Sequence, residues 1–244
     1  MSQSSRSCLL TELSWIDVAE HIAHDSRLIV PIGACDQYGP HLPIGAGTLI
    51  AEAVSLELAR DFGVLRAPTI SYGVNLPTER SHPGTAGLHA KNLHRVLNDL
   101  LASWEDDGFT EFILITAHRY DVHIESIATV SGTGARVRAV EVLGIDFSHI
   151  VEGGGGREHG GEVLTSLMLH LYPDRVDLAR AADYRPAGEG ESRTWRLRRL
   201  PPESHGLVGE PTLATAEKGR LIFEHILQRV RARVFLSTDD GADR

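Results

Sequence analysis

The sequence is poor in cysteine, in aromatic residues and in long apolar runs, and it has no excess of positive charge. Two cysteines in 244 residues are too few for the disulfide framework of a small secreted protein. The longest apolar run, residues 28–33, is far shorter than the roughly 18 residues that span a bilayer, so we expect no membrane association. A net charge of −9 opposes binding to phosphate backbones, and we expect no nucleic acid partner.

The remaining composition is that of a globular chain. Hydrophobic residues make up 42%, enough for a core, and no repeat or low-complexity linker divides residues 1–244, which we interpret as one domain. Residues 181–209 are rich in proline and glycine and predict an irregular excursion, and residues 237–244 predict a flexible acidic tail. Residues 1–7 lead into no signal-type apolar core, so we expect a cytoplasmic protein.

Short apolar runs alternate with segments of helical periodicity. The runs predict strands at residues 28–33, 64–68, 112–115 and 137–143. Helical spacing predicts helices at residues 15–26, 48–61, 92–104, 124–130, 162–171 and 215–236, the first with Ser14 as its N-cap and Asp17 at N3. This alternation predicts an α/β fold, a three-layer sandwich with a mostly parallel central sheet.

Polar residues follow two of the predicted strands, at residues 36–41 and 118–121. In open parallel sheets the ligand crevice lies beyond the carboxyl ends of the strands, so we expect both segments to line it. A third polar cluster, Glu158, His159 and Glu162, stands at the start of a predicted helix, where a carboxylate could face the same crevice.

Motifs in these segments resemble the creatininase (creatinine amidohydrolase) family over nearly the whole chain. The matching stretches are Val30-Pro31-Ile32-Gly33, Gly39-Pro40-His41-Leu42-Pro43, Tyr72-Gly73, Pro83-Gly84-Thr85, Gly108-Phe109, Glu158-His159-Gly160-Gly161, Thr165-Ser166-Leu167-Met168-Leu169, Gly209-Glu210-Pro211 and the run from Ala214 to Gly219. The resemblance implies a creatininase-like fold, a ring-like homohexamer, and a small-molecule substrate. The family's type enzyme opens a cyclic amide with water at two divalent metals.

The family's metal ligands are depleted after the first strand. The family pattern there is Glu-x-His followed by a metal-bridging Asp, and this sequence has Asp36, Tyr38 and Gly47 at those positions. A phenol with a reference pKa near 10 is a poor ligand at neutral pH, and glycine has no side chain. An ordinary dinuclear centre is therefore not expected.

After the later strand the type enzyme has His-x-Glu, and this sequence keeps His118 but has Tyr120 in the acidic position. Glu162 matches an acid that many relatives carry instead. The resemblance therefore leaves two alternatives open. One is a single zinc or manganese ion held by Asp36, His118 and Glu162, because three protein ligands plus water form a usable catalytic site. The other is a metal-independent pocket.

The pair Glu158-His159 is intact. In the type enzyme this His relays a proton and the neighbouring Glu orients it; a purely structural role, capping the following helix, is the alternative. Tyr38, Arg119, Tyr120 and His41 are the candidate substrate-binding residues. An arginine fork can hold a carboxylate, a phosphate or an oxyanion, and tyrosines can donate to an oxyanion. These residues could equally fill the vacated volume, and His41 could be a structural histidine.

Two functions from different classes follow. The first is an enzyme acting on an amide or related carbonyl C–N bond of a small polar metabolite, cyclic amides included, in a specialised biosynthetic pathway. Its reaction is either hydrolysis or a metal-independent cyclisation or elimination derived from it. The second is a non-catalytic ligand-binding or assembly subunit with the same fold. Loss of the bridging acid at Gly47 favours the second, whereas the polar groups that remain, Glu158, His159, Glu162 and His118, favour the first.

Overall fold

The computed structural model describes residues 7–76, 79–131, 134–153, 158–186 and 200–236. Its sheet has four strands, in the order β2-β1-β3-β4, and every pairing in it is parallel. The strands are β1 (Arg27–Ile32), β2 (Leu65–Arg66), β3 (Glu111–Thr116) and β4 (Arg136–Glu141). β1 and β3 lie side by side along their whole length, with Ile32 opposite Thr116 at the carboxyl end.

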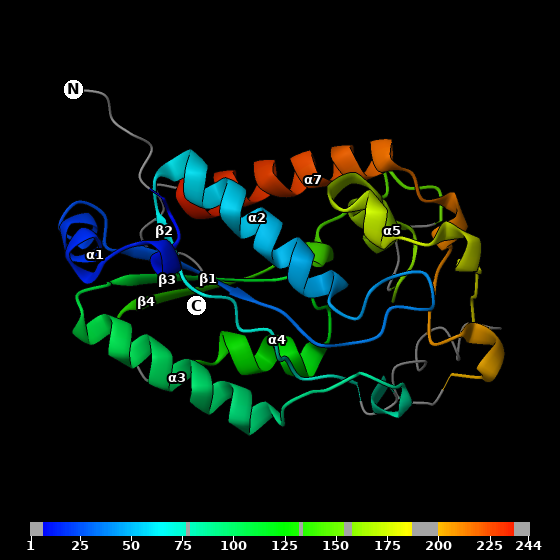
Figure 1. Cartoon of the computed structure of the whole chain (residues 1–244), viewed down its shortest axis with the longest axis horizontal. Coiled ribbons are helices and arrows are strands. Elements are labelled where there is room, and N and C mark those ends of the chain that lie inside the picture. Colours follow the sequence, from blue (N-terminus) through cyan, green and yellow to red (C-terminus); the bar gives the residue numbers. More distant parts are fainter. Residues whose placement is uncertain (1–6, 77–78, 132–133, 154–157, 187–199, 237–244) are drawn as a thin grey trace.

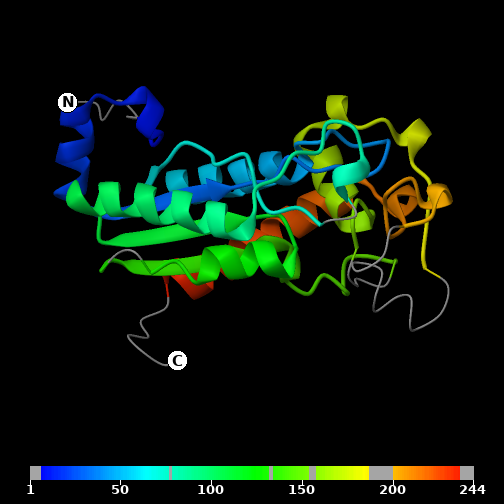
Figure 2. The ribbon, with the colours of Figure 1, turned by 90° about the horizontal axis from the view of Figure 1, so that it is seen from below.

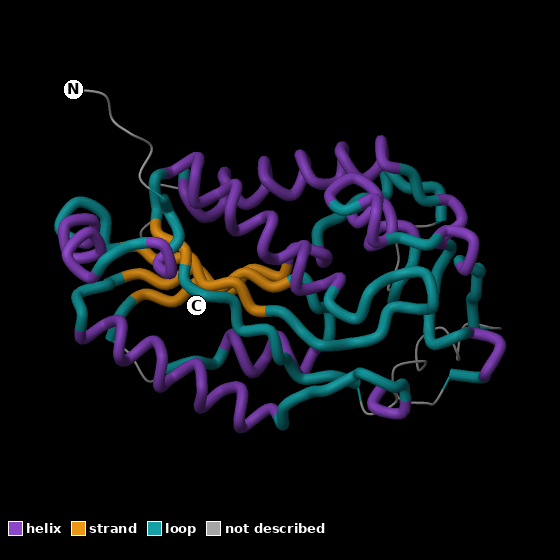
Figure 3. Tube along the Cα trace, viewed as in Figure 1, coloured by secondary structure: helices purple, strands orange, loops and turns teal. Residues whose placement is uncertain are grey.

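Helices cover both faces of the sheet (Figure 1). One face carries α2 (Ala46–Phe62), α5 (Glu162–Leu171) and α7 (Ala216–Val230), and the other carries α3 (Ala90–Asp106) and α4 (Asp121–Ala128). α1 (Trp15–Ile22) lies at the end of the molecule where the strands begin (Figure 3). The three-layer α/β sandwich predicted from the sequence is confirmed.

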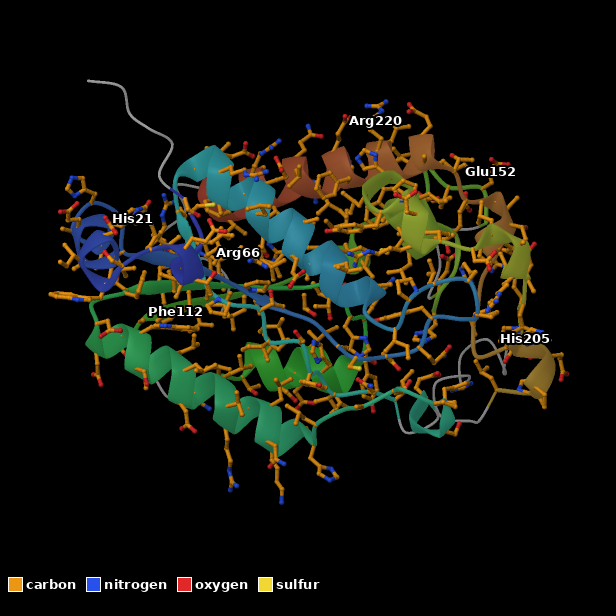
Figure 4. The ribbon with its side chains drawn as sticks, in the orientation of Figure 1. His21, Arg66, Phe112, Glu152, His205 and Arg220 are labelled. Carbon is orange, nitrogen blue, oxygen red and sulfur yellow. The ribbon has the colours of Figure 1, made fainter. Side chains whose placement is uncertain are left out.

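The strands read as continuous apolar runs because both of their faces are buried. In β1 and β3, Leu28 and Phe112 pack into the core under α3 and α4, while Ile29 and Ile113 pack into the core under α2, α5 and α7. Phe112 is fully buried and lies between the helical layers in Figure 4. Alternate residues thus fill two cores, and register is fixed by both.

α5 has the predicted bounds, and α1 begins at Trp15 as predicted but ends at Ile22, four residues before the predicted end. Ser14 accepts from the backbone N–H of Asp17, and the side chain of Asp17 accepts from the N–H of Ser14, which is the expected capping box. The long closing helix differs from its prediction, because α7 ends at Val230 and continues as a π-helical turn, η9 (Arg231–Phe235). No helix in the described ranges is long and apolar enough to cross a membrane.

The connections between the longer elements are largely irregular and contain short 3-10 helices. These are η1 (Leu10–Glu12), η2 (Glu79–Ser81), η3 (Val142–Gly144), η4 (Pro173–Arg175), η5 (Leu178–Arg180), η7 (Pro202–Ser204) and η8 (Pro211–Leu213). The predicted excursion at residues 181–209 is irregular where it is described, and residues 187–199 of it lie outside the described residues, as does the predicted tail at 237–244.

α5 and α7 cross in direct backbone contact, and a glycine makes this possible. A Cβ atom built on Gly219 of α7 would lie 1.9 Å from the carbonyl oxygen of Ser166 of α5. Because that oxygen belongs to the backbone, it cannot move without displacing the helix. The packing distance between these two helices therefore depends on the absence of a side chain at Gly219.

We expect Gly219→Ala to lower the free energy of unfolding by about 3 kcal/mol through overpacking, although alanine in an exposed helix is normally better than glycine by about 1 kcal/mol. Urea denaturation followed by circular dichroism measures this. Gly45→Ala is the matched control, because a Cβ there has no heavy atom within 4 Å and φ is −90°. Equal unfolding midpoints for the two variants would contradict the packing argument.

Candidate active site

The site forms at the carboxyl edge of the sheet, where the segments after β1 and β3 emerge side by side (Figure 2). Asp36 and His118 are both buried, with Oδ2 of Asp36 4.0 Å from Nδ1 of His118. His118 Nε2 lies 3.0 Å from the carbonyl oxygen of Val74 and donates to it, so Nδ1 is the acceptor. The hydroxyl of Tyr38, 3.3 Å away, donates to that Nδ1.

A third segment brings His159 to the same place. Its backbone pairs with Val208 in an antiparallel bridge, with both N–H to O distances 2.9 Å. The imidazole stacks on the ring of Tyr38 at a centroid distance of 5.0 Å, and its Nε2 donates to the backbone oxygen of Gln37 at 2.7 Å. His159 therefore faces the loop that carries Asp36 and Tyr38.

Glu79, on η2, completes this group and was missed from the sequence. Its carboxylate accepts from the side-chain amide of Gln37, which also donates to the backbone oxygen of Gly206 at 2.5 Å. The ligand atoms of Asp36, Glu79 and His159 all lie within 4.8 Å of one another, which makes them a possible metal-binding group within the described ranges. The signal available was an acid just before the family-like stretch Pro83-Gly84-Thr85, but nothing in its spacing pointed to the crevice.

The two acids of this group are held in an unfavourable electrostatic environment. Burial raises the pKa of Asp36 to about 8, and the charge of Glu79 adds to this shift, while the N–H of Gln37 opposes it. Oδ2 of Asp36 is buried without a hydrogen-bond partner. Burial also raises the pKa of Tyr38 well above its usual value, so the phenol stays protonated. Two carboxylates and an imidazole with one unsatisfied oxygen are suitable donors for a divalent cation such as zinc.

A narrow cavity of about 50 Å³ opens beside this group. Of the predicted residues, Tyr38, His118, Arg119, Tyr120, Glu158 and His159 line it. Burial raises the pKa of Glu158 to about 7, and its Oε1 has no hydrogen-bond partner. Arg119 reaches the backbone oxygen of Leu143 at 3.4 Å and stays partly exposed. This volume is well below that of typical pockets for organic ligands.

The sequence led us to expect Glu162 beside Asp36 and His118, but the structure places it elsewhere. Glu162 is fully buried at the start of α5, where Lys218 donates to its Oε1 at 2.5 Å. The backbone N–H groups of Glu152 and Gly153 also donate to this carboxylate, at 2.7–3.2 Å. Its oxygens are thus used to fix the loop that leads toward Glu158 and His159.

His41 also lies apart from the cavity lining. It is buried, and its Nε2 is 2.9 Å from the hydroxyl of Thr165, which itself donates to the backbone oxygen of Gly160. Nδ1 of His41 is buried without a partner, so a proton there would have no acceptor. Burial accordingly lowers the pKa of His41 to about 4. These contacts match the structural alternative for this residue.

Tyr38 and Gly47 fit each other in space. A Cβ on Gly47 would lie 2.5 Å from the hydroxyl oxygen of Tyr38 and 3.0 Å from the backbone oxygen of Ala117. A side chain at position 47 and a tyrosine at position 38 are therefore incompatible in this arrangement. The two departures from the family pattern form one linked exchange.

Comparison with known proteins decides the family. The family model described as "Creatinine amidohydrolase" matches residues 11–234. The chain belongs to the creatininase family.

This creatininase-family chain is 29% identical to a creatinine amidohydrolase of Pseudomonas putida, over 93% of this chain and 95% of that protein. It is also 29% identical to a mycofactocin precursor peptide peptidase of Mycobacterium ulcerans, over 85% and 84%. A crystal structure of creatinine amidohydrolase superposes with a TM-score of 0.79 at 26% identity, covering 96% of this chain and all of that one. Other matching creatininase structures are described as a zinc–zinc form and a manganese form.

The ion pair between the partly buried Lys218 and the fully buried Glu162 generates a stability prediction. Lys218→Met leaves the Glu162 carboxylate buried with backbone donors alone, and we expect the free energy of unfolding to fall by about 3 kcal/mol. Lys91→Met, at the chain's other lysine, is the control, since Lys91 is exposed on α3. Chemical denaturation of both variants measures the difference. If Lys218→Met is as stable as Lys91→Met, the pair does not hold the loop.

The neutral state of His41 generates a pH prediction. Its folded pKa of about 4 is below the usual value of 6.5, so the unfolded chain takes up a proton first as the pH falls. The resulting stability is complete above pH 6.5 and is lost on acidification toward pH 4, by up to about 3 kcal/mol. We expect His41→Gln, which can still donate to Thr165, to flatten this acid limb. The exposed His89→Gln is the control, and an unchanged limb in His41→Gln would refute the assignment.

Proposed function

We propose that this chain is a hydrolase of an amide or related C–N bond in a small polar substrate, with the reacting bond in the cavity lined by Tyr38, His118, Glu158 and His159. The observation that carries the proposal is the convergence of Asp36, Glu79 and His159 beside that cavity. The creatinine and peptide substrates named for two relatives support an amide as the reacting group.

Asp36 and Glu79, with His159, are the residues that would hold one divalent ion, and His118 lies next to Asp36. When bound, zinc or manganese supplies an acidified water and polarises a carbonyl group. The donor set supports this assignment because Oδ2 of Asp36 is unsatisfied and because a cation would offset the repulsion between the two acids.

The cavity residues would carry out proton transfer and substrate binding. Water attacks the carbonyl carbon, the C–N bond breaks, and the leaving nitrogen takes a proton. Glu158 is placed to carry that proton from the attacking water to the nitrogen, because it lines the cavity and its Oε1 has no hydrogen-bond partner. Arg119, at the rim, is placed to bind an anionic group of the substrate, and Tyr120 borders the same space.

His159 has two proposed roles that exclude each other at one nitrogen. As part of the group with Asp36 and Glu79 it binds the ion, whereas as the family's proton relay it moves a proton next to the substrate. Stacking on Tyr38 holds the ring in place for either role, whereas Nε2, which lies 3.9 Å from Oε2 of Glu79, would have to give up its hydrogen bond to Gln37 in order to bind the ion. The experiment below separates the two.

The second candidate, a non-catalytic ligand-binding or assembly subunit, has two observations in its favour. The phenol of Tyr38 takes up the space that a side chain at Gly47 would need, and the amide of Gln37 lies against both Glu79 and His159. In this alternative Gln37, Glu79 and His159 form a fixed structural network through these amide contacts.

The test is metal analysis of the full chain, purified without added metal or chelator, together with release of amine from cyclic amides and short peptides. We expect about one zinc or manganese per chain. Asp36→Asn and Glu79→Gln should lose it at least tenfold, with activity, whereas Glu162→Gln keeps it if folded. His159→Gln separates the roles: loss of metal indicates a ligand, and retained metal with at least a hundredfold lower kcat indicates a proton relay.

Three results would count against the proposal. Glu158→Gln should keep the metal and lose kcat, so unchanged kcat there removes Glu158 from the reaction. Full activity of metal-free wild type, with loss on His159→Gln, would assign the metal-independent pocket. Wild type that neither holds metal nor releases amine, but binds the same amides, would assign the non-catalytic subunit.

A further inference from the structure

A second cavity, of about 700 Å³, lies beside the outer edge of β4, which pairs only with β3 in the described sheet. Ile124 and Ile127 of α4 and Ala139 and Val140 of β4 give it an apolar floor. It is separate from the active-site cavity, because Leu143 faces that cavity while Gly144 and Ile145 face this one. Its volume is in the range of sites for organic ligands, whereas 50 Å³ is not.

One wall of this cavity is basic. Arg229 of α7 and Arg233 of η9 are four residues apart and both line it. Neither makes a hydrogen bond or ion pair with any part of the chain that the structure describes, although Arg231 between them donates to Asp61. Like charges one helical turn apart repel each other. Arg229 and Arg233 are both exposed, so water solvates these two guanidinium groups and leaves them available to an anion.

The acids in the cavity do not supply that anion. The carboxylate of Glu141 accepts from the N–H of Leu143 at 2.6 Å, and that of Asp146 accepts from the N–H of Ser148 at 2.9 Å. Each carboxylate is thus tied to its own loop, and that of Glu141 also lies 4.0 Å from Nε of Arg119. His149 and His225, whose rings meet edge to face at 4.8 Å, complete the polar lining.

We propose that this cavity binds an organic anion, a phosphate ester or a carboxylate with an apolar body. Guanidinium forks bind both kinds of anion through paired hydrogen bonds, and Arg229 and Arg233 present two forks on one side. The aliphatic floor takes the apolar body, which an inorganic ion would leave uncovered. The site stands independently of the proposed hydrolysis, because no residue of the active-site cavity belongs to it.

The test is calorimetric titration of the full chain with 1-naphthyl phosphate, 1-naphthoate, 1-naphthol and inorganic phosphate. We expect the phosphate ester, the carboxylate or both to bind at least tenfold more tightly than 1-naphthol and inorganic phosphate. The double variant Arg229→Gln/Arg233→Gln should weaken that binding at least tenfold. Arg231→Gln, on the same helix end but outside the cavity, is the matched control and should change it less than twofold.

Several results would overturn the proposal. Wild-type affinity in the double variant would place binding elsewhere, and equal affinity for 1-naphthol would show that the arginines are not used. Inorganic phosphate binding as tightly as the ester would reduce the site to a simple ion site. Sedimentation of the same samples covers the remaining alternative: a smaller assembly in the double variant, without loss of ester binding, would make this face an interface between copies of the chain.

Discussion

The parallel pairing of β1 with β3 is the constraint on which the site depends. Because Ile32 lies opposite Thr116, the chain leaves both strands at the same edge and at the same height. Asp36 and His118 are therefore adjacent, although 82 residues separate them. Both strands are buried on two faces, so a slip in register would disturb two cores at once. The position of the site is thus set by apolar packing some distance from any catalytic group.

The parts of the site that are not strand ends are held by polar contacts. Gln37 joins the β1 loop to Glu79 and Gly206 through its side chain, and to His159 through its backbone oxygen. Glu162 and Lys218 fix the loop ahead of His159 from the opposite side. Glu152, part of that network, and His205, in the loop next to Gly206, lie at the same end of the molecule in Figure 4. Apolar packing thus positions the strand ends of the site, and hydrogen bonds and ion pairs position its loops.

This difference explains what the sequence could and could not predict. Buried strands leave apolar runs and amphipathic helices leave periodic ones, so the layers and the placing of Asp36 and His118 at one edge could be predicted. Glu79 lies on η2, in a connection without periodicity, and its side chain is placed by contacts with Gln37, His82 and His159 that the sequence does not reveal. Glu162 was taken for a metal ligand by family resemblance. Its partner Lys218 is 56 residues further on, and a buried ion pair leaves no pattern in a sequence.

The two departures from the family pattern at Tyr38 and Gly47 change how much positive charge the ligands of the site can balance. In the family pattern these positions supply an imidazole and a bridging carboxylate, whereas here a phenol that stays protonated fills the space of both. The carboxylate of that pattern at position 47 is absent, and Asp36 and Glu79 are the acids present in the group with His159. Two carboxylates and one imidazole suit the single ion proposed above better than a dinuclear centre.

The protonation state of Asp36 depends on whether a cation is bound. Without a cation, the pKa of about 8 keeps Asp36 protonated at neutral pH, and its carboxyl group is then a hydrogen-bond donor. With a cation, the same group must ionise, so uptake of metal at neutral pH releases a proton. The two alternatives thus differ in what Oδ2 of Asp36 binds. In a metal hydrolase it binds a metal ion, and in a metal-independent pocket it binds a proton.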